Sequence, residues 1–275
     1  MALSREGETI ATEGLGLEAE RVPADPVSPR QRAFVVVNAN AGSSAATNIR
    51  AAVDEVFLEH GLDYELYETT TGEEIGDVAR KAIERGHELL VAAGGDGTIS
   101  AVADALIGTT IPLGVIPAGT ANVLARELGL PLDARDACRV IAERAHTRRI
   151  DAMRVGKRHY LFQVGIGIDS LMIRDTQRLQ KQRFGRLAYL WTACTRLLGF
   201  QPRRFLIETD GKRRKRRASQ VVVANGGVFG MPPYVWGPNI RLDDQRLDVC
   251  VVHARTLFDY LGLFWDLFLG RTHAN

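Results

Sequence analysis

The feature that most constrains the fold is an apolar run that ends in a glycine-rich turn. Residues 89–93 are Leu-Leu-Val-Ala-Ala, and Gly94-Gly95-Asp96-Gly97-Thr98 follows directly, ahead of a helix-like segment at 99–106. A buried strand that runs into a glycine turn and a helix N-terminus directs backbone N–H groups and the positive end of the helix dipole at an anion. This pattern predicts a phosphate site in an α/β protein. The alternative is a turn whose glycines serve packing, with Asp96 as a helix cap.

The rest of the N-terminal half alternates between strand-like and helix-like segments. We expect strands at 34–37, 63–69, 89–93 and 113–116, and helices at 45–60, 73–85, 99–106, 121–128 and 135–145. Strict alternation with short connections predicts a doubly wound, mostly parallel sheet with helices on both faces. The carboxyl ends of its strands would then bring together Asn38, Thr69, the glycine turn at 94–98 and Gly119-Thr120.

The pattern changes near residue 150, which suggests a second, β-rich domain. Strand-like runs occupy 152–155, 160–164, 204–209, 219–224 and 247–253, with a hairpin turn at Asp210-Gly211 and a helical segment at 181–198. Residues 1–32 are rich in Glu, Gly and Pro without an apolar period, so we expect a disordered tail. The expected domains are therefore an α/β domain at 33–149, which carries the predicted phosphate site, and a β-rich domain at 150–275.

Composition and absent motifs exclude several classes of protein. The net charge of +2 gives no overall field for nucleic acid, and three separated cysteines without CxxC spacing favour a reduced, cytoplasmic setting. No GxxxxGK[ST] or HExxH motif occurs, which argues against a P-loop NTPase and a zinc hydrolase. Gly165-Ile166-Gly167 begins like a dinucleotide fingerprint, but Ser170 stands where its third glycine belongs.

Two further motifs give the chain a family resemblance. Gly94–Thr98 is followed by Pro117-Ala118-Gly119-Thr120-Ala121-Asn122, and together they resemble the catalytic domain of diacylglycerol kinases, in the soluble bacterial lipid-kinase branch. The first motif is shared with NAD kinases and phosphofructokinases, whereas the second is more specific. Matches continue through Val223-Ala224-Asn225-Gly226 and Leu242-Asp243-Asp244. The resemblance implies a two-domain, ATP-dependent kinase that phosphorylates a lipid hydroxyl. Residues 33–149 would form its nucleotide-binding domain, and residues 150–275 its β-sandwich domain for the lipid substrate.

The resemblance also implies roles for particular residues. The nucleotide would be bound by Asn38, Thr69 (with Thr70 and Thr71 as register alternatives), Gly94, Gly95, Asp96, Gly97, Thr98, Ile99, Ser100, Gly119, Thr120 and Asn122. Asp96 would act on the ATP phosphates through Mg²⁺ or through water. A structural Mg²⁺ site would use the Asp244 carboxylate with the backbone carbonyls of Arg241 and Arg246, which is suitable hard-oxygen chemistry. A solvated turn is the alternative for Asp243-Asp244.

Three departures from the family pattern stand out. Gln245 occupies a position where glycine is usual, so a positive φ there would be strained. Phe162-Gln163-Val164 lacks the asparagine common before the GxG segment. The acidic motif that would supply the base for the lipid hydroxyl is expected after the apolar helix at 257–269, and the sequence stops at Asn275 before any such motif. We therefore expect the chain as given to be truncated and nearly inactive, unless Asp169 or Asp96 serves as the base.

A run of basic residues bears on the partners of the protein. Lys212, Arg213, Arg214, Lys215, Arg216 and Arg217 follow the Asp210-Gly211 turn. Because a strand sends about half of them to one side, they predict weak, peripheral contact with the inner face of an anionic membrane. A solvated hairpin tip is the alternative, and no nucleic acid is expected. A homodimer is left open.

These observations lead to one main functional prediction and two alternatives. The main prediction is an ATP- and Mg²⁺-dependent lipid kinase of diacylglycerol-kinase type. One alternative is an NAD kinase, which shares the glycine-rich turn but is disfavoured by the PAGTAN segment. The other is a nucleotide-binding membrane adaptor without catalytic activity. The sequence does not identify the acceptor lipid.

Overall fold

The computed structural model divides the chain into two compact units. It describes residues 4–6, 32–38, 43–70, 72–143, 147–167, 202–229, 234–237, 239–254 and 256–269. The described residues of the N-terminal unit lie within Leu17–Leu161, and those of the C-terminal unit lie within Met1–Gly16 and Phe162–Asn275. The division between the units lies between Leu161 and Phe162, beyond the boundary near residue 150 that the strand and helix pattern predicts. The expected helix at 181–198, together with Asp169 and Thr71, lies outside the described residues.

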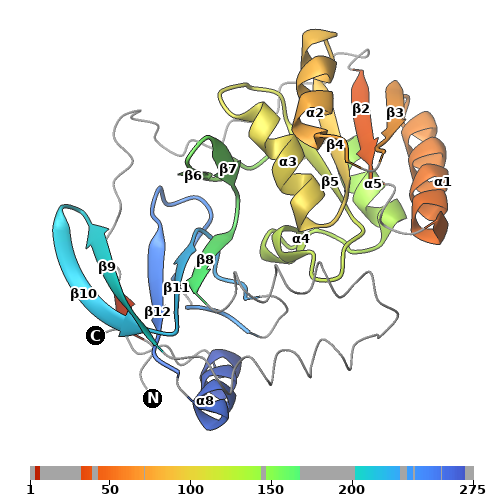
Figure 1. The fold of residues 1–275 in the computed structure, drawn as a ribbon. Coiled ribbons are helices and arrows are strands. Elements are labelled where there is room, and N and C mark those ends of the chain that lie inside the picture. The colour runs from red at the N-terminus through yellow and green to blue at the C-terminus, as the bar shows by residue number, and fades with distance from the viewer. Residues whose placement is uncertain are drawn as a thin grey trace. The chain divides into compact units, whose positions relative to one another are not determined.

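A parallel sheet forms the centre of the N-terminal unit (Figure 1). Its strands are β2 (Ala33–Val37), β3 (Tyr64–Glu68), β4 (Leu89–Gly94) and β5 (Leu113–Pro117), in the order β3-β2-β4-β5. Every residue of β2 and β4 is buried, as expected for strands covered on both faces. The predicted doubly wound parallel sheet is confirmed.

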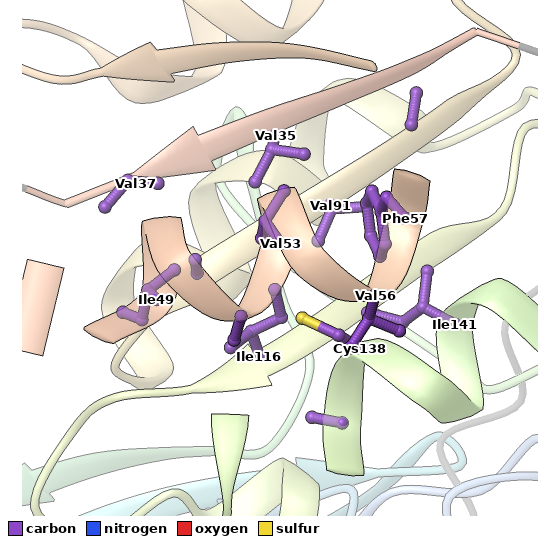
Figure 2. Close-up of a cluster of buried hydrophobic side chains, with 14 of the residues drawn as sticks. Val35, Val37, Ile49, Val53, Val56, Phe57, Val91, Ile116, Cys138 and Ile141 are labelled. Atoms are coloured by element: carbon purple, nitrogen blue, oxygen red, sulfur yellow. The ribbon is translucent and has the colours of Figure 1, made fainter. Parts of the chain in front are cut away.

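Helices cover both faces of this sheet (Figure 1). The helices α1 (Ser43–Glu59) and α5 (Ala134–Glu143) pack on one face, and α2 (Ile75–Glu84) and α3 (Asp96–Leu106) pack together on the other. Figure 2 shows the first of these cores, where Val35 and Val91 of the sheet meet Val53 and Phe57 of α1. Cys138 of α5 lies in the same cluster, and its burial raises the pKa of the thiol to about 12.

A short hairpin completes the N-terminal unit. It is formed by β6 (Met153–Val155) and β7 (Arg158–Tyr160), and β7 packs against α3. The prediction of one strand at 160–164 is wrong, because the chain bends at Leu161 and Phe162 and begins β8 at Gln163 (β8, Gln163–Gly167). Leu161 is only 4% exposed, so its burial fixes this bend at the boundary between the two units.

An antiparallel sheet forms the centre of the C-terminal unit. Its order is β1-β12-β11-β8, with β1 (Ser4–Glu6), β11 (Gln220–Ala224) and β12 (Asp248–Val252). The sequence predicts disorder for residues 1–32, but Ser4–Glu6 form β1. The edge of β12 offers unpaired backbone hydrogen-bonding groups, and this short segment pairs with them. Val222, Trp236 and Cys250 form a buried core with Leu263.

Two further elements belong to the C-terminal unit. One is a hairpin of β9 (Arg203–Thr209) and β10 (Lys212–Ala218), joined by Asp210 and Gly211. Both turn residues have positive φ, 48° and 75°, as the predicted two-residue turn requires. The other is α8 (Leu257–Phe268). Within the part of the chain that the structure describes, no helix has the length and apolar character to cross a membrane.

Candidate functional site

The site forms at the carboxyl edge of the parallel sheet. The chain leaves β2 toward β3 on one side, whereas β4 lies on the other side, so the strand order reverses between β2 and β4. Ligands of open α/β sheets bind at such a reversal, beyond the carboxyl ends of the strands. Asn38 and the glycine-rich turn follow β2 and β4, and the Asn38 N–H donates to the Ala93 carbonyl at 3.0 Å. These two expected site segments therefore lie side by side.

The N-terminus of α3 presents backbone N–H groups at this edge. Its N-cap is Gly95, which makes no side-chain cap hydrogen bond. The amides of Thr98 and Ile99 both donate to the Gly95 carbonyl, at 2.9 and 3.1 Å. The N–H groups of Asp96 and Gly97 precede them and have no acceptor within the helix. These two amides, at the positive end of the helix dipole, suit an anionic ligand.

Two glycines let the loop after β5 pass close to this turn. A Cβ atom at Gly119 would lie 2.6 Å from the Gly95 Cα atom, and one at Gly95 would lie 3.3 Å from the Gly119 Cα atom. The Ala118 N–H donates to the Gly94 carbonyl at 2.9 Å and holds the two loops together. The two sequence motifs thus form one continuous backbone surface at the sheet edge.

Thr98 has a role within the protein itself. Its side chain is 3% exposed, and its Oγ1 accepts a hydrogen bond from Asn38 Nδ2 at 2.8 Å. A Cβ atom at Gly94 would lie 2.6 Å from the same Oγ1, so the first glycine of the motif makes room for Thr98. The Thr98 side chain therefore joins the segments that follow β2 and β4.

Asn122 fixes the second loop in a similar way. It is 7% exposed and has a left-handed backbone with φ 48°. Its Oδ1 accepts from the Gly119 N–H at 2.8 Å, and its Nδ2 donates to the Gly119 carbonyl at 3.0 Å. Asparagine is among the few residues that tolerate this conformation. Asn122 therefore shapes the turn on which Gly119 approaches Gly95.

Asp96 bridges the two loops. Its Oδ1 accepts the backbone N–H of Leu124 at 3.3 Å, in the first turn of α4 (Val123–Glu127). The structural alternative, in which Asp96 caps a helix, does not hold for α3, of which Asp96 is the first residue, but the Asp96 carboxylate does accept a first-turn amide of α4. Asp96 is half-buried beside the open amides of α3, which places its carboxylate next to the candidate anion site.

The remaining expected contacts differ in exposure. Gly97 and Thr120 are exposed, Ser100 is half-buried, and Ile99 is fully buried, so its side chain belongs to the core. Thr69 is 4% exposed, whereas its neighbour Thr70 is exposed. Of these two register alternatives, Thr70 therefore offers the more accessible hydroxyl.

A matched family model covers each of the two units. The model of the diacylglycerol kinase catalytic domain matches residues 32–155, and that of a YegS C-terminal, NAD kinase β-sandwich-like domain matches residues 162–275. A probable YegS-like lipid kinase of Pseudomonas putida is 30% identical over 72% of this chain and 67% of its own length. The chain belongs to the diacylglycerol kinase catalytic-domain family.

Other relatives and a solved structure agree with this family. A diacylglycerol kinase of Bacillus subtilis is 27% identical over 84% of this chain and 77% of its own length. The crystal structure of a putative diacylglycerol kinase from Bacillus anthracis matches with a TM-score of 0.69 and 25% identity, over 89% of this chain and 82% of that one. Against two other relatives the chain spans only 53% and 62% of their length.

The expected magnesium segment of this kinase-family chain forms a tight turn. The Asp244 Oδ1 atom accepts the Arg246 N–H at 3.0 Å, and Gln245 between them has φ 59°. The positive φ anticipated at Gln245 is therefore present, in a position where glycine would be less strained. One carboxylate with backbone carbonyls fits Mg²⁺ chemically. No group of three or more His, Cys, Asp or Glu side chains suited to a metal occurs among the described residues.

Glu73 was not predicted to act near the site, but its carboxylate braces the loop after β3 through hydrogen bonds. Glu73 Oε2 accepts the Thr70 N–H at 3.1 Å, and Glu73 Oε1 accepts the Tyr67 hydroxyl at 2.7 Å. The hydrogen bond from Tyr67, followed by that from the Thr70 backbone, lowers the pKa of Glu73. The spacing Thr70-x-x-Glu73 is that of a capping box, so it could have indicated these hydrogen bonds from the sequence alone. The brace holds the loop after β3, where Thr69 and Thr70 lie.

Proposed function

We propose that the protein is an ATP-dependent lipid kinase that transfers the γ-phosphoryl group to the hydroxyl of a diacylglycerol-like lipid. Membership of the diacylglycerol kinase family supports kinase activity, and two relatives are named as kinases of diacylglycerol or lipid. The acceptor would lie in a bilayer, so the reaction would occur at the cytoplasmic face of a membrane. This class of reaction depends mainly on positioning and on neutralising charge.

The observation that carries the proposal is the exposed glycine at the N-terminus of α3. Gly97 is exposed, its φ is not positive, and a Cβ atom there would meet no atom of the described residues within 4 Å. Neither the backbone conformation nor the packing of the described residues therefore requires glycine at this position. Close approach of a ligand to the α3 amides gives a reason for it. We assign the ATP phosphates to this surface, between Gly97 and the Gly95–Gly119 contact.

Two segments would hold Mg²⁺ in this proposal. Asp96 would bind the ion that accompanies the nucleotide, and Asp244 with the carbonyls of Arg241 and Arg246 would bind a structural ion. When bound, Mg²⁺ neutralises negative charge on phosphoryl oxygens. The chain itself supplies the fixed amides of Asp96 and Gly97, and the hydrogen bond from Leu124 orients the Asp96 carboxylate. Thr120, exposed at the tip of the second loop, would add a hydroxyl contact.

A pair of glycine substitutions tests the proposed phosphate site. Gly97→Ala places a methyl group between the α3 amides and the ligand, and we expect ATP affinity to fall about tenfold or more. Fold stability should hold or rise slightly, because alanine favours a helix over glycine. Gly262→Ala in α8 is the matched control, since a Cβ atom there also meets nothing within 4 Å.

Titration of each variant with ATP in the presence of Mg²⁺, alongside thermal unfolding, provides the measurement. The proposal predicts that only Gly97→Ala loses affinity while both variants stay folded. Unchanged ATP affinity in folded Gly97→Ala would place the phosphates elsewhere.

A further inference from the structure

The β9–β10 hairpin separates its side chains into two different faces. The strands pair antiparallel with Arg213 opposite Glu208, Lys215 opposite Leu206, and Arg217 opposite Arg204. Because directly opposite residues in a hairpin point to the same side, these six side chains share one face. All six residues are exposed. We call this set the outer face.

The other face of the hairpin packs against the antiparallel sheet of the C-terminal unit. Phe205 and Ile207 contact a buried cluster that includes Ala218 of β10 and Val221 and Val251 of the antiparallel sheet. The alternation of exposed and less exposed residues along both strands follows from this packing. The packing fixes which residues form the outer face, so the outer face is a defined surface. The six basic residues thus form, together with Ala218, a seven-residue strand and not a loop at a hairpin tip.

The outer face carries four cations and one carboxylate. Arg213 Nε lies 2.8 Å from Glu208 Oε2, so the positive charge of Arg213 and the negative charge of Glu208 offset each other. Arg204 and Arg217 lie directly opposite each other, and like charges in this position destabilise a strand pair. An anionic surface would remove that repulsion. Leu206 lies between the cations of this face and is 61% exposed.

We propose that the outer face docks on an anionic lipid bilayer, with Leu206 entering the headgroup region between Arg204, Lys215 and Arg217. Charge complementarity favours an anionic partner, and an exposed leucine among cations fits a surface whose interior is apolar. Single-stranded nucleic acid is usually bound with aromatic stacking, and no aromatic residue lies on the outer face. The inference rests on the proposed function only in explaining why a kinase would bind a membrane.

Vesicle binding without ATP tests this inference separately from catalysis. The probes are phosphatidylcholine vesicles with and without phosphatidylglycerol, and co-sedimentation gives the partition coefficient of the full protein. Each basic residue near an anionic surface contributes about a fivefold gain in binding. The triple variant Arg204→Gln, Lys215→Gln, Arg217→Gln should therefore lose about 100-fold at low salt, and the difference should shrink at high salt.

A second triple variant removes the same charge from another surface. Arg149, Arg154 and Lys157 are exposed cations of the N-terminal unit, and their replacement by Gln should change vesicle binding less than about threefold. Replacing Arg204 and Arg217 by Lys should retain binding, because the charge remains. Leu206→Ser keeps every charge and should weaken binding about fivefold, with a loss that persists at high salt. Circular dichroism verifies that each variant is folded.

Three outcomes would overturn the inference. One is equal loss from the two triple variants, which would indicate a general charge effect. The second is unchanged binding in the outer-face variant. The third is tighter binding of the wild type to single-stranded nucleic acid than to anionic vesicles at the same salt. Kinase activity does not enter any of these measurements, so the proposed function and the docking surface can fail independently.

Discussion

At the scale of single residues, the glycines of the two motifs serve different purposes. Gly94 makes room for Thr98, Gly95 and Gly119 allow two backbones to meet, and Gly97 borders open space. The sequence predicted a glycine-rich phosphate turn, but it could not separate these roles, because each depends on what lies opposite the missing Cβ atom. Similarly, Asn122 was expected to contact the nucleotide, and the structure shows it closing the turn around Gly119.

The contact between Gly95 and Gly119 leads to a prediction about stability. Gly119→Ala would place a Cβ atom 2.6 Å from the Gly95 Cα atom, and neither backbone can move without disturbing the loops. We expect the free energy of unfolding to fall by about 1–3 kcal/mol. Chemical denaturation measures the change, with Gly97→Ala as the control in open space. Equal stability of the two variants would mean that the loops separate easily.

At the scale of elements, Asp104 attaches the β6–β7 hairpin to α3. Its Oδ1 accepts the His159 backbone N–H at 2.9 Å and lies 2.8 Å from His159 Nδ1, while Arg80 Nη1 lies 3.9 Å from Oδ2. Burial is the largest influence and raises the pKa of Asp104, but the hydrogen bonds from His159 and the nearby positive charges lower it overall. A lowered pKa in the folded state stabilises the fold above the ordinary aspartate pKa of about 4, and this contribution is lost as pH falls below it.

Asp104→Asn should therefore reduce stability in a pH-dependent way. At neutral pH we expect a loss of about 1–2 kcal/mol, because the charged acceptor of two hydrogen bonds is removed. Below about pH 4 the difference from wild type should narrow, since Asp104 is protonated first in the unfolded chain and then, at its lowered pKa, in the folded protein. Denaturation across this pH range tests the prediction. Asp136→Asn, in an exposed pair with Arg139, is the control and should change stability by less than about 1 kcal/mol. A pH-independent loss in Asp104→Asn would contradict this account.

The elements were predictable where local pattern and packing agree. The strand at 89–93 and the two-residue turn at Asp210-Gly211 follow from an apolar run and from turn chemistry, and both occur. The division of the expected 160–164 strand was not predictable, because it depends on Leu161 being buried at the end of one unit. The pairing of β1 with β12 joins residues more than 240 positions apart, which no local pattern indicates. For the same reason, the sequence revealed the basic run but not the register that places Leu206 among its cations.

At the scale of the whole molecule, two compact units correspond to two family domains. The N-terminal unit contains the glycine loops, Asp96 and the braces that hold them, and the C-terminal unit contains the Asp244 turn and the basic outer face. In the proposed function these parts serve one activity, phosphoryl transfer from ATP to a lipid hydroxyl. NAD kinases share the glycine-rich turn, so the identity of the acceptor decides between the two enzymes.

The most direct test is transfer of label from γ-³²P-ATP by the full-length gene product, including any residues that follow Asn275. The acceptors are diacylglycerol, phosphatidylglycerol, a sphingoid base and NAD, each supplied with Mg²⁺, and Asp96→Asn is the matched variant. Asparagine retains an oxygen for the Leu124 N–H, so the fold should persist while turnover falls about 100-fold or more. The account predicts labelled lipid with the wild type and almost none with Asp96→Asn. Label in NAD alone, or equal lipid labelling by both proteins, would contradict it.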